Sequence, residues 1–520
     1  GMPRPNPTVG QPGPHRPRRA AGGALGALLA TVLVAACSGT ALPQAEGSNG
    51  VLPGGHAAAG QQVTGTPPTV ALATGQPRSS GGVVASGGPS APYNYAPSVL
   101  ESHGTYRMWW CSQLPGAARP GDQILYATAT SPNGPFTAPD HRPGQPVFTN
   151  STNGFDRLHT CDPSVIGVDG VYYLYYTGTS DRRGDHNAIG LATSTDGVHW
   201  ARANGGAPIV SAAGDANHGN DYGAGQPAAL YLNGMFYLMF TDTTGAATAA
   251  NGAGQFVLRS PDPTFRRGVQ ALGPRGFASV IGATGVRTRS VADATTSDWM
   301  WVDALQAFAI ASDNPNGTTI TFWDAGFDYH PYQPVTIAGP QREGPGLVRT
   351  AEGHAPVDIA NPCGEVPLDV IRPTGVAAGP DGLQHFGVDV ASRSGCRTRA
   401  AALALLNGFA VPAPDRTVDI VVGGHLVEVE RRSVALALAA GMVRNPPPSV
   451  AALPVQAHLR AGATAMSATG RPVGIQLDDG RLWVVGTAAV AQLNSSPVET
   501  VTDQRWDSYP RGADLSHLRP

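Results

Sequence analysis

The sequence contains no lysine and few charged side chains of any kind. Its 34 basic residues are all arginine, its 37 acidic residues bring the net charge to −3, and charged residues make up 14% of the 520 residues. A small, balanced charge gives no general electrostatic attraction to nucleic acid or anionic lipid. We therefore expect no nucleic-acid partner. P-loop, nucleotide-binding and haem-attachment patterns are also missing, so we expect no cofactor.

Cysteine is scarce as well, with five residues in the chain. No two of them have the CxxC spacing of a structural zinc site, so we expect no metal at these cysteines. Four of them form an even set that can pair in an oxidising compartment: Cys111, Cys161, Cys363 and Cys396. Three pairings are possible, and the choice depends on where these cysteines lie in the fold.

The one long hydrophobic run, AAGGALGALLATVLVAAC, lies near the N-terminus and ends at Cys37. Arg16, Arg18 and Arg19 precede it and small residues end it, which is the pattern of a secretory signal peptide. The tetrad VAAC resembles a bacterial lipobox, in which the cysteine is lipidated and becomes the mature N-terminus. This resemblance implies a signal peptide at residues 1–36, lipidation of Cys37 and an extracytoplasmic protein anchored to the bacterial cell membrane. A plain signal peptide with an incidental cysteine is the alternative.

Residues 37–90 are rich in Gly, Ala, Ser, Pro and Thr, with scattered Val. No helical or strand periodicity persists there, and such a composition cannot bury a core. We predict a disordered tether between the anchor and the first folded domain.

Three internal repeats carry the prediction of the fold. They read APSVLESHGTYRMWWCS (96–112), DPSVIGVDGVYYLYYTG (162–178) and QPAALYLNGMFYLMFTD (226–242). Each has a proline, a short apolar strand, a turn dipeptide that tolerates positive φ, and an aromatic strand. A third strand follows each repeat. Recurring antiparallel meanders of this kind are typical of propeller blades.

A degraded fourth copy spans 297–324, and a fifth begins at 342–350 and continues at 384–392. We predict an all-β fold with a five-bladed β-propeller at 91–405, although the pattern leaves four or six blades open. The segment DPSVIGVDGVYYLYYTGT with IGLATSTDGVHW resembles the five-bladed propeller glycosidases around arabinanase/xylosidase family 43 and the β-fructosidases. The GPG at residues 344–346 is similar to their last blade. The resemblance implies a carbohydrate partner.

The pattern changes from about Thr417. Two segments, beginning GGHLVEVERRS and DGRLWVVGTAA, each have a Gly turn, an apolar strand, a helix-like or polar stretch, a Pro-Val and a final Gly. The second, ending RWDSYPRGADL, resembles small repeats found at the ends of exported bacterial envelope proteins. We predict a small accessory α+β module of two short repeats at 415–520, and a single α/β domain is an equal alternative.

Residues at the heads of the innermost propeller strands converge on the centre, so the positions before the repeated prolines are candidate site residues. The second repeat offers Asp162 there, and the third offers Gln226 with Asp221 upstream. The first repeat has Ala96 where the resembled families place a catalytic Asp, and Asn94 is the nearest polar residue. Glycoside hydrolysis needs two carboxyl groups, so at least one partner for Asp162 is required.

Glutamate is rare in this region: between Tyr93 and Val348 the chain has Glu101 and Glu343 alone. If the general acid is a glutamate, as the resemblance implies, Glu343 is the candidate. We predict as catalytic residues Asp162, Glu343 and Asp298, and as sugar-binding residues Asp221, Gln226, His159, Arg157 and Asn94. The alternative for Asp162 is a structural one, because Asp before Pro favours an extended loop whose N–H groups the side chain can bind.

The cysteines fit the same arrangement. Cys111 ends the second strand of the first blade and Cys161 opens the second blade, so a bridge would hold the loop of Asp162. Cys363 and Cys396 both fall in the closing blade, where a bridge would help to hold the fold shut. We therefore expect the pairs Cys111–Cys161 and Cys363–Cys396.

Two functions agree with these patterns. The first is a lipid-anchored, monomeric glycoside hydrolase of the family 43 kind that acts on an extracytoplasmic glycan containing arabinose or xylose. The second is a catalytically inactive propeller that binds glycan or organises the cell envelope. Asp162 and Glu343 favour the first, whereas Ala96 and Gln226 at acid positions favour the second.

Overall fold

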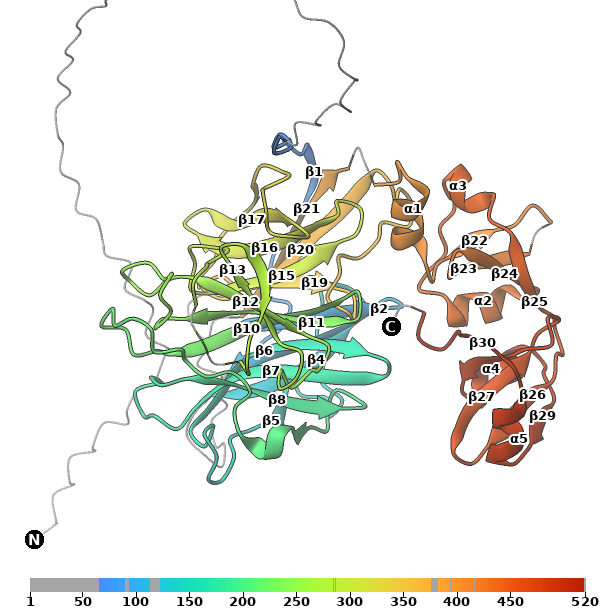
Figure 1. Ribbon diagram of the computed structural model, residues 1–520, viewed down its shortest axis with the longest axis horizontal. Helices are drawn as coiled ribbons and strands as arrows, with labels where there is room; N and C mark the ends of the chain where they lie inside the picture. Colours follow the sequence, from blue (N-terminus) through green and yellow to red (C-terminus); the bar gives the residue numbers. More distant parts are fainter. Residues whose placement is uncertain are drawn as a thin grey trace, which may run out of the picture.

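The computed structural model describes residues 65–88, 93–112, 122–283, 285, 287–375, 382–392, 395–415 and 417–518. This part of the chain is mainly β, with 30 strands, five α-helices and the short 3-10 helix η1 (Asn204–Gly206). Figure 1 shows β1 to β21 gathered in one body, with the later elements in a second body beside it. None of the helices in these ranges has the length and hydrophobicity that crossing a membrane requires. The predicted signal peptide 1–36 and Cys37 lie outside the described residues.

The first body consists of five antiparallel meanders. Meander 1 contains β2 (Asn94–Ser102), β3 (Thr105–Ser112), β4 (Gln123–Ala129) and β5 (Gln145–Phe148). Meander 2 contains β6 (His159–Val168), β7 (Val171–Thr179), β8 (Ala188–Ser194) and β9 (Ala201–Arg202). Meander 3 contains β10 (Ala224–Leu232), β11 (Met235–Asp242), β12 (Gln255–Ser260), β13 (Gln270–Gly273) and β14 (Gly276–Ser279).

Meander 4 contains β15 (Ser297–Val302), β16 (Ala307–Asn314), β17 (Gly317–Asp324) and β18 (Val335–Ala338). Meander 5 contains β19 (Gly346–Arg349), β20 (Glu365–Pro373), β21 (Leu383–Ala391) and, from the other end of the chain, β1 (Thr74–Ser79). β1 pairs antiparallel with β21, and β19 pairs parallel with β2, so meanders 5 and 1 share one eight-stranded sheet.

β1 lies within 37–90, so the prediction of a disordered tether is wrong for the described residues 65–88. The strand TGQPRS has no apolar pattern, because it is an edge strand held by backbone hydrogen bonds to β21. Arg78 adds ion pairs to Asp369 (3.0 Å) and Asp389 (2.7 Å). Neither interaction leaves a periodic hydrophobic signal in the sequence.

Aromatic and branched side chains form a separate apolar cluster between each meander and its neighbour. One cluster, which includes Trp109 and Tyr176, lies between meanders 1 and 2. Others lie between meanders 2 and 3, 3 and 4, and 4 and 5. A further cluster, which includes Trp110 and Ile371, lies between meanders 5 and 1. The hydrophobic effect therefore acts between sheets, which explains why the strands of the repeats are apolar on both faces.

In meanders 1 and 2 the serine after the repeated proline links its meander to the next one, whereas meander 3 has Ala228 at this position. Ser98 Oγ accepts a hydrogen bond from the N–H of Val165 (2.9 Å), and Ser164 Oγ accepts one from the N–H of Ala229 (2.9 Å). Asp298 Oδ2 has the same role between meanders 4 and 5, where it accepts from the N–H of Leu347 (2.8 Å). Asp298 is therefore the counterpart of Ser98 and Ser164. Meander 4 has Ser297 where the repeats have proline, so Thr296 is the counterpart of Asp162.

Arg349 of β19 connects the innermost strands from within. Its guanidinium donates to the carbonyl oxygens of Ala229 and, at 3.1 Å each, of Val165 and Trp299. These three carbonyls are equivalent positions of β6, β10 and β15, one residue beyond the serine position. The side chain is fully buried, and burial lowers the pKa of Arg349 while the charge of Asp298 opposes that shift.

The GPG of residues 344–346 reflects the close approach of β19 to β2. A Cβ on Gly346 would lie 2.2 Å from the carbonyl oxygen of Pro97, and one on Gly344 would lie 2.9 Å from the backbone of Ala96. Gly344 also has a φ of 68°, a conformation that glycine adopts at little cost. Larger residues would force β19 away from β2.

The structure confirms both predicted disulfides. Cys111 of β3 and Cys161 of β6 have their Cα atoms 5.1 Å apart, and Cys363 and Cys396 have theirs 5.3 Å apart. The first joins meander 1 to meander 2, and the second closes a loop around β20 and β21.

The second body begins with α1 (Arg399–Leu406) and contains two sheets, unit 1 and unit 2 (Figure 1). Unit 1 contains β22 (Ala410–Pro412), β23 (Val418–Val422), β24 (His425–Val429), α2 (Arg432–Leu438), α3 (Pro448–Ala451) and β25 (Val455–Leu459). Unit 2 contains β26 (Ala465–Ala468), β27 (Arg471–Gln476), β28 (Leu482–Gly486), α4 (Ala488–Leu493), β29 (Val498–Thr500), α5 (Asp503–Ser508) and β30 (Arg511–Asp514).

The two units have the same topology. In each, three antiparallel strands lead to a helix, and the chain then pairs in parallel with the first strand, through the Ala410–Met442 bridge in unit 1 and β29 in unit 2. A second helix follows, and the last strand, β25 or β30, pairs in parallel with the third strand. Equivalent residues of the two units can therefore be compared directly.

We expect Arg349→Met to lower the free energy of unfolding by about 3–5 kcal/mol, because it leaves three carbonyls unpaired and the buried Asp298 uncompensated. Arg275→Met, at an exposed position, is the matched control and should change stability by less than about 0.5 kcal/mol. Urea unfolding followed by tryptophan fluorescence measures both. Equal midpoints for the two variants would contradict the bridging role of Arg349.

Candidate functional site

The heads of the innermost strands of all five meanders meet at one narrow pit. The pit is lined by Ala96, Pro97, Asp162, Pro163, Gln226, Pro227, Thr296, Ser297, Asp298, Gly344 and Pro345. Its cavity volume is about 30 Å³, which is room for one or two water molecules and too little for a sugar ring. A sugar that used this pit would therefore lie across its mouth.

β-bulges aim the side chains into the pit. The pairing of β2 with β3 skips Ala96 and Pro97, that of β6 with β7 skips Asp162 and its proline, and that of β10 with β11 skips Gln226 and its proline. The three residues before proline have φ values of 49°, 47° and 51°. Such left-handed backbone costs about 1–3 kcal/mol at non-glycine residues and persists where the surrounding structure enforces it.

Asp162 is a buried carboxyl group of the pit with a raised pKa. It is 5% exposed, and its Oδ2 atom has no hydrogen-bond partner within the described residues. Burial raises the pKa of Asp162 to about 6, against the opposing influence of His159 and the Thr177 hydroxyl. A buried carboxyl group that faces a cavity and titrates near neutral pH is a common feature of sites that exchange protons with a ligand.

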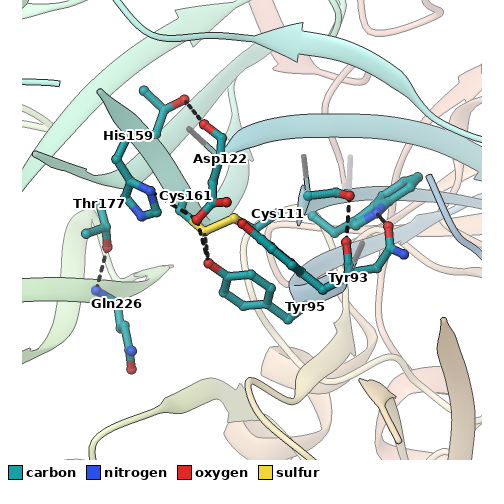
Figure 2. Close-up of a disulfide and its surroundings, with 12 residues drawn as sticks. Tyr93, Tyr95, Cys111, Asp122, His159, Cys161, Thr177 and Gln226 are labelled. Atoms are coloured by element: carbon teal, nitrogen blue, oxygen red, sulfur yellow. Dashed lines mark hydrogen bonds and ion pairs between the residues drawn. A yellow bond between two sulfur atoms is a disulfide. The ribbon is translucent and has the colours of Figure 1, made fainter. Parts of the chain in front are cut away.

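His159 and Asp122 form a buried pair next to the Cys111–Cys161 disulfide (Figure 2). His159 Nδ1 lies 3.0 Å from Asp122 Oδ2, and the Tyr95 hydroxyl donates to the same oxygen at 3.0 Å. Burial alone would lower the pKa of His159, but the carboxylates of Asp122 and Asp162 outweigh it, and the net shift is upward. The two members of the pair act on the pKa of Asp162 in opposite directions, since His159 lowers it and Asp122 raises it.

Cys111, Cys161 and Asp122 also lie within 4.8 Å of one another, a spacing that a metal ion could use. Both sulfur atoms are consumed by the disulfide, and only a thiolate is a good metal ligand. The Tyr95 hydroxyl instead packs 2.9 Å from Cys161 Sγ. This cluster serves to fix the strand that carries Asp162.

Asp298 lines the pit, but both of its carboxylate oxygens are engaged. Oδ1 accepts from the N–H of Trp299 (2.9 Å) and Oδ2 from the N–H of Leu347 (2.8 Å). Burial raises the pKa of Asp298, and the charge of Arg349 opposes that shift. This arrangement favours a structural role over the predicted catalytic one.

Gln226 and Tyr222 lie beside Asp162. The Gln226 N–H donates to Thr177 Oγ1 (2.7 Å; Figure 2), while its side-chain Oε1 has no partner among the described residues. Burial and then the charge of Asp162 raise the pKa of Tyr222 well above its ordinary value, with a smaller contribution from Glu343. Glu343 is half-buried and immediately precedes the pit residues Gly344 and Pro345.

Of the five predicted sugar-binding residues, Gln226 lines the pit and the other four, including the buried His159, do not. Asp221 and Arg157 are exposed. Asn94 is fully buried, and its Oδ1 accepts a hydrogen bond from Trp110 Nε1 (2.8 Å), so it packs meander 1. The structure brings together Asp162, Gln226 and Asp298, with His159 and Glu343 adjacent.

Sequence reasoning missed four residues that shape the site: Asp122, Tyr222, Thr296 and Arg349. Thr296 could have been found by aligning Trp299 of the fourth repeat with Val165 of the second, instead of aligning Asp298 with Asp162. Asp122 and Tyr222 lie in the connections before β4 and β10, outside the repeats, so no local signal identifies them.

No protein-family model matches the chain. A segment of 145 residues is 30% identical to a probable arabinan endo-1,5-alpha-L-arabinosidase A from Aspergillus niger, and covers 27% of this chain and 38% of that protein. A segment of 58 residues is 40% identical to a 1,2-beta-oligomannan phosphorylase from a Thermoanaerobacter species, and covers 11% of this chain and 19% of that protein. The matches thus span well under half of these relatives' lengths.

Solved structures of low sequence identity also match. Zg3597, a family 117 glycoside hydrolase from Zobellia galactanivorans, is 14% identical with a TM-score of 0.43, over 61% of this chain and 90% of that chain. The alpha-L-arabinofuranosidase PaAbf62A from Podospora anserina is 12% identical with a TM-score of 0.35, over 61% of this chain and 97% of that chain.

We expect Asp162→Asn to stabilise the protein above neutral pH. Because the pKa of Asp162 is raised from 3.8 to about 6, the folded state favours the protonated carboxyl, and stability falls as pH rises through 6. The amide stays neutral, so at pH 8 the free energy of unfolding of the variant should exceed that of the wild type by on the order of 2 kcal/mol. This difference should vanish below about pH 4. Urea unfolding at pH 4, 6 and 8 measures this difference.

The exposed Asp221→Asn is the control for this comparison and should follow the wild type at every pH. If Asp162 were instead a cap whose charge stabilises its loop, Asp162→Asn would lower stability at pH 8.

Proposed function

We propose that this protein is a glycoside-hydrolase-like β-propeller whose five meanders are blades around the pit, and that it acts on a glycan with arabinose- or xylose-type ends. The observation that carries the proposal is Asp162: a buried carboxyl with an unpartnered oxygen and a pKa raised to about 6, at the point where five strand heads converge. The segment similar to an arabinan endo-1,5-alpha-L-arabinosidase supports the choice of sugar.

In this proposal Asp162 is the proton donor. Below about pH 6 its carboxyl holds a proton that it can give to a glycosidic oxygen at the mouth of the pit, and His159 stabilises the carboxylate that results. Glu343, at the rim beside Gly344, supplies the second carboxylate for the water or the anomeric carbon. Gln226 and Tyr222 offer an acceptor and a donor for sugar hydroxyls.

A non-catalytic glycan receptor is the second candidate, and one observation favours it. Of the positions before proline, Asp162 alone carries an acid, while Ala96, Gln226, Thr296 and Gly344 occupy the others. Such a protein would hold a glycan end through Asp162 and Gln226 without cleaving it.

We also propose where the protein is located in the cell. A lipid-anchored, extracytoplasmic, monomeric protein with an accessory module of units 1 and 2 would bring the pit to glycans of the cell envelope. Two disulfides support export, because such bonds persist in oxidising compartments. Mass spectrometry of the N-terminal peptide of protein made in a bacterial host would detect a lipidated Cys37, and an unmodified cysteine would contradict the anchor.

The activity is tested with arabinan, xylan and aryl arabinofuranosides and xylosides at pH 5 to 7. We expect hydrolysis by the wild type, and a loss of at least about 100-fold in kcat/KM for Asp162→Asn and for Glu343→Gln. Glu101→Gln is the matched control, because Glu101 lies at the β2–β3 turn, where its Oε1 accepts from the N–H of Gly104 (2.9 Å) and an amide can do the same.

The receptor hypothesis predicts a different outcome. The wild type would bind arabinan in calorimetry without releasing sugar, and Asp162→Ala would weaken that binding. A protein that neither cleaves nor binds any glycan of the panel would contradict both functions.

A further inference from the structure

Unit 1 of the second body carries three ionisable side chains in a row across its sheet. Asp419 of β23 is directly opposite Glu428 of β24, and Glu428 is directly opposite His458 of β25. Side chains of directly paired residues on neighbouring strands share one face of a sheet. The three side chains therefore lie next to one another on that face.

His458 is oriented by a fourth residue. Its Nδ1 lies 2.7 Å from Asp478 Oδ2, and its backbone N–H donates to Asp478 Oδ1 at 2.7 Å. The other ring nitrogen, Nε2, lies 3.7 Å from Glu428 Oε2, too far for a hydrogen bond. A metal-ligating histidine usually donates its other ring N–H to a carboxylate, and Asp478 is placed to accept from Nδ1 of His458 in this way.

Asp419 is a buried carboxyl group with a vacant acceptor. It is 5% exposed, and its Oδ1 has no hydrogen-bond partner within the described ranges. Two carboxyl groups paired across strands repel each other when both are charged, and a bound cation would remove that repulsion.

Unit 2 shows that the shared topology does not need this cluster. Gly474 pairs with Val484 where Asp419 pairs with Glu428, and Val484 pairs with Asp514 where Glu428 pairs with His458. Unit 2 thus forms the same sheet with one acid and no imidazole at these positions. The shared topology therefore does not require the cluster of unit 1.

We propose that unit 1 binds a divalent zinc ion between Asp419, Glu428 and His458, with Asp478 holding the imidazole. One imidazole and two carboxylates are ligands that Zn²⁺ accepts, and a fourth position would stay open to water or to a ligand. Among the described residues these donor atoms do not all lie within 4.8 Å of one another, so binding requires side-chain rotation. Neighbouring strands are about 4.8 Å apart, which Glu428, with its three rotatable side-chain bonds, can span.

Calorimetric titration of the full chain with ZnCl₂ at pH 7.5 tests the site. We expect one-to-one binding, weakened at least about 100-fold in Asp419→Asn and in His458→Gln, and about 10–100-fold in Asp478→Asn. His199→Gln is the matched control, because His199 is an exposed histidine that also bears an aspartate at Nδ1, Asp196 at 2.6 Å. This variant should bind zinc as the wild type does.

A thermal shift assay distinguishes a lost site from a misfolded variant. Zinc should raise the unfolding temperature of the wild type and of His199→Gln and leave that of Asp419→Asn unchanged, whereas the variant without zinc should be at least as stable as the wild type. Zinc affinity that survives in Asp419→Asn and His458→Gln, or calcium binding as tight as zinc binding, would overturn the proposal. The test is independent of glycan hydrolysis.

Discussion

The first body depends on the hydrogen bonds that one buried guanidinium, that of Arg349, donates to backbone carbonyls of the innermost strands. β6, β10 and β15 are each the first strand of their sheet and pair on one side only, and Arg349 binds equivalent carbonyls of all three. Because Arg349 also lies on β19, whose backbone pairs with β2, one residue connects all five meanders. Asp298 supplies the compensating negative charge, so a residue that looks catalytic in the sequence is needed for the fold.

The β-bulges at the repeated prolines give neighbouring strand positions different roles. In meanders 1, 2 and 4 one strand position links neighbouring meanders through Ser98, Ser164 or Asp298, and its chemistry is constrained by that bond. The residue before the proline points into the pit and makes no such link, so it is free to be Ala96, Asp162 or Gln226. A repeat built this way can change its site chemistry without changing its fold, which is why fold alone does not identify activity.

The second body follows a similar division. Its two units share one order of strands and helices, yet the acidic row with His458 occurs in unit 1 alone. In both bodies the repeat supplies a scaffold, and a few polar residues in one copy depart from the pattern. Those departures, Asp162 in the first body and Asp419 in the second, are also the buried carboxyl groups whose pKa is raised to about 6.

The sequence by itself determined the antiparallel meanders, the head positions and both disulfides, because turn dipeptides, prolines and apolar strands are local signals that repeat. It did not reveal β1, whose pairing at a sheet edge needs no apolar pattern. Nor did it reveal the partnership of Asp122, just before β4, with His159, the first residue of β6. Only the tertiary structure distinguished the role of Asp298 from that of Asp162. Both are acids at strand heads, but backbone N–H groups reach both oxygens of Asp298 and leave Oδ2 of Asp162 unpartnered, and such contacts arise only when distant strands meet.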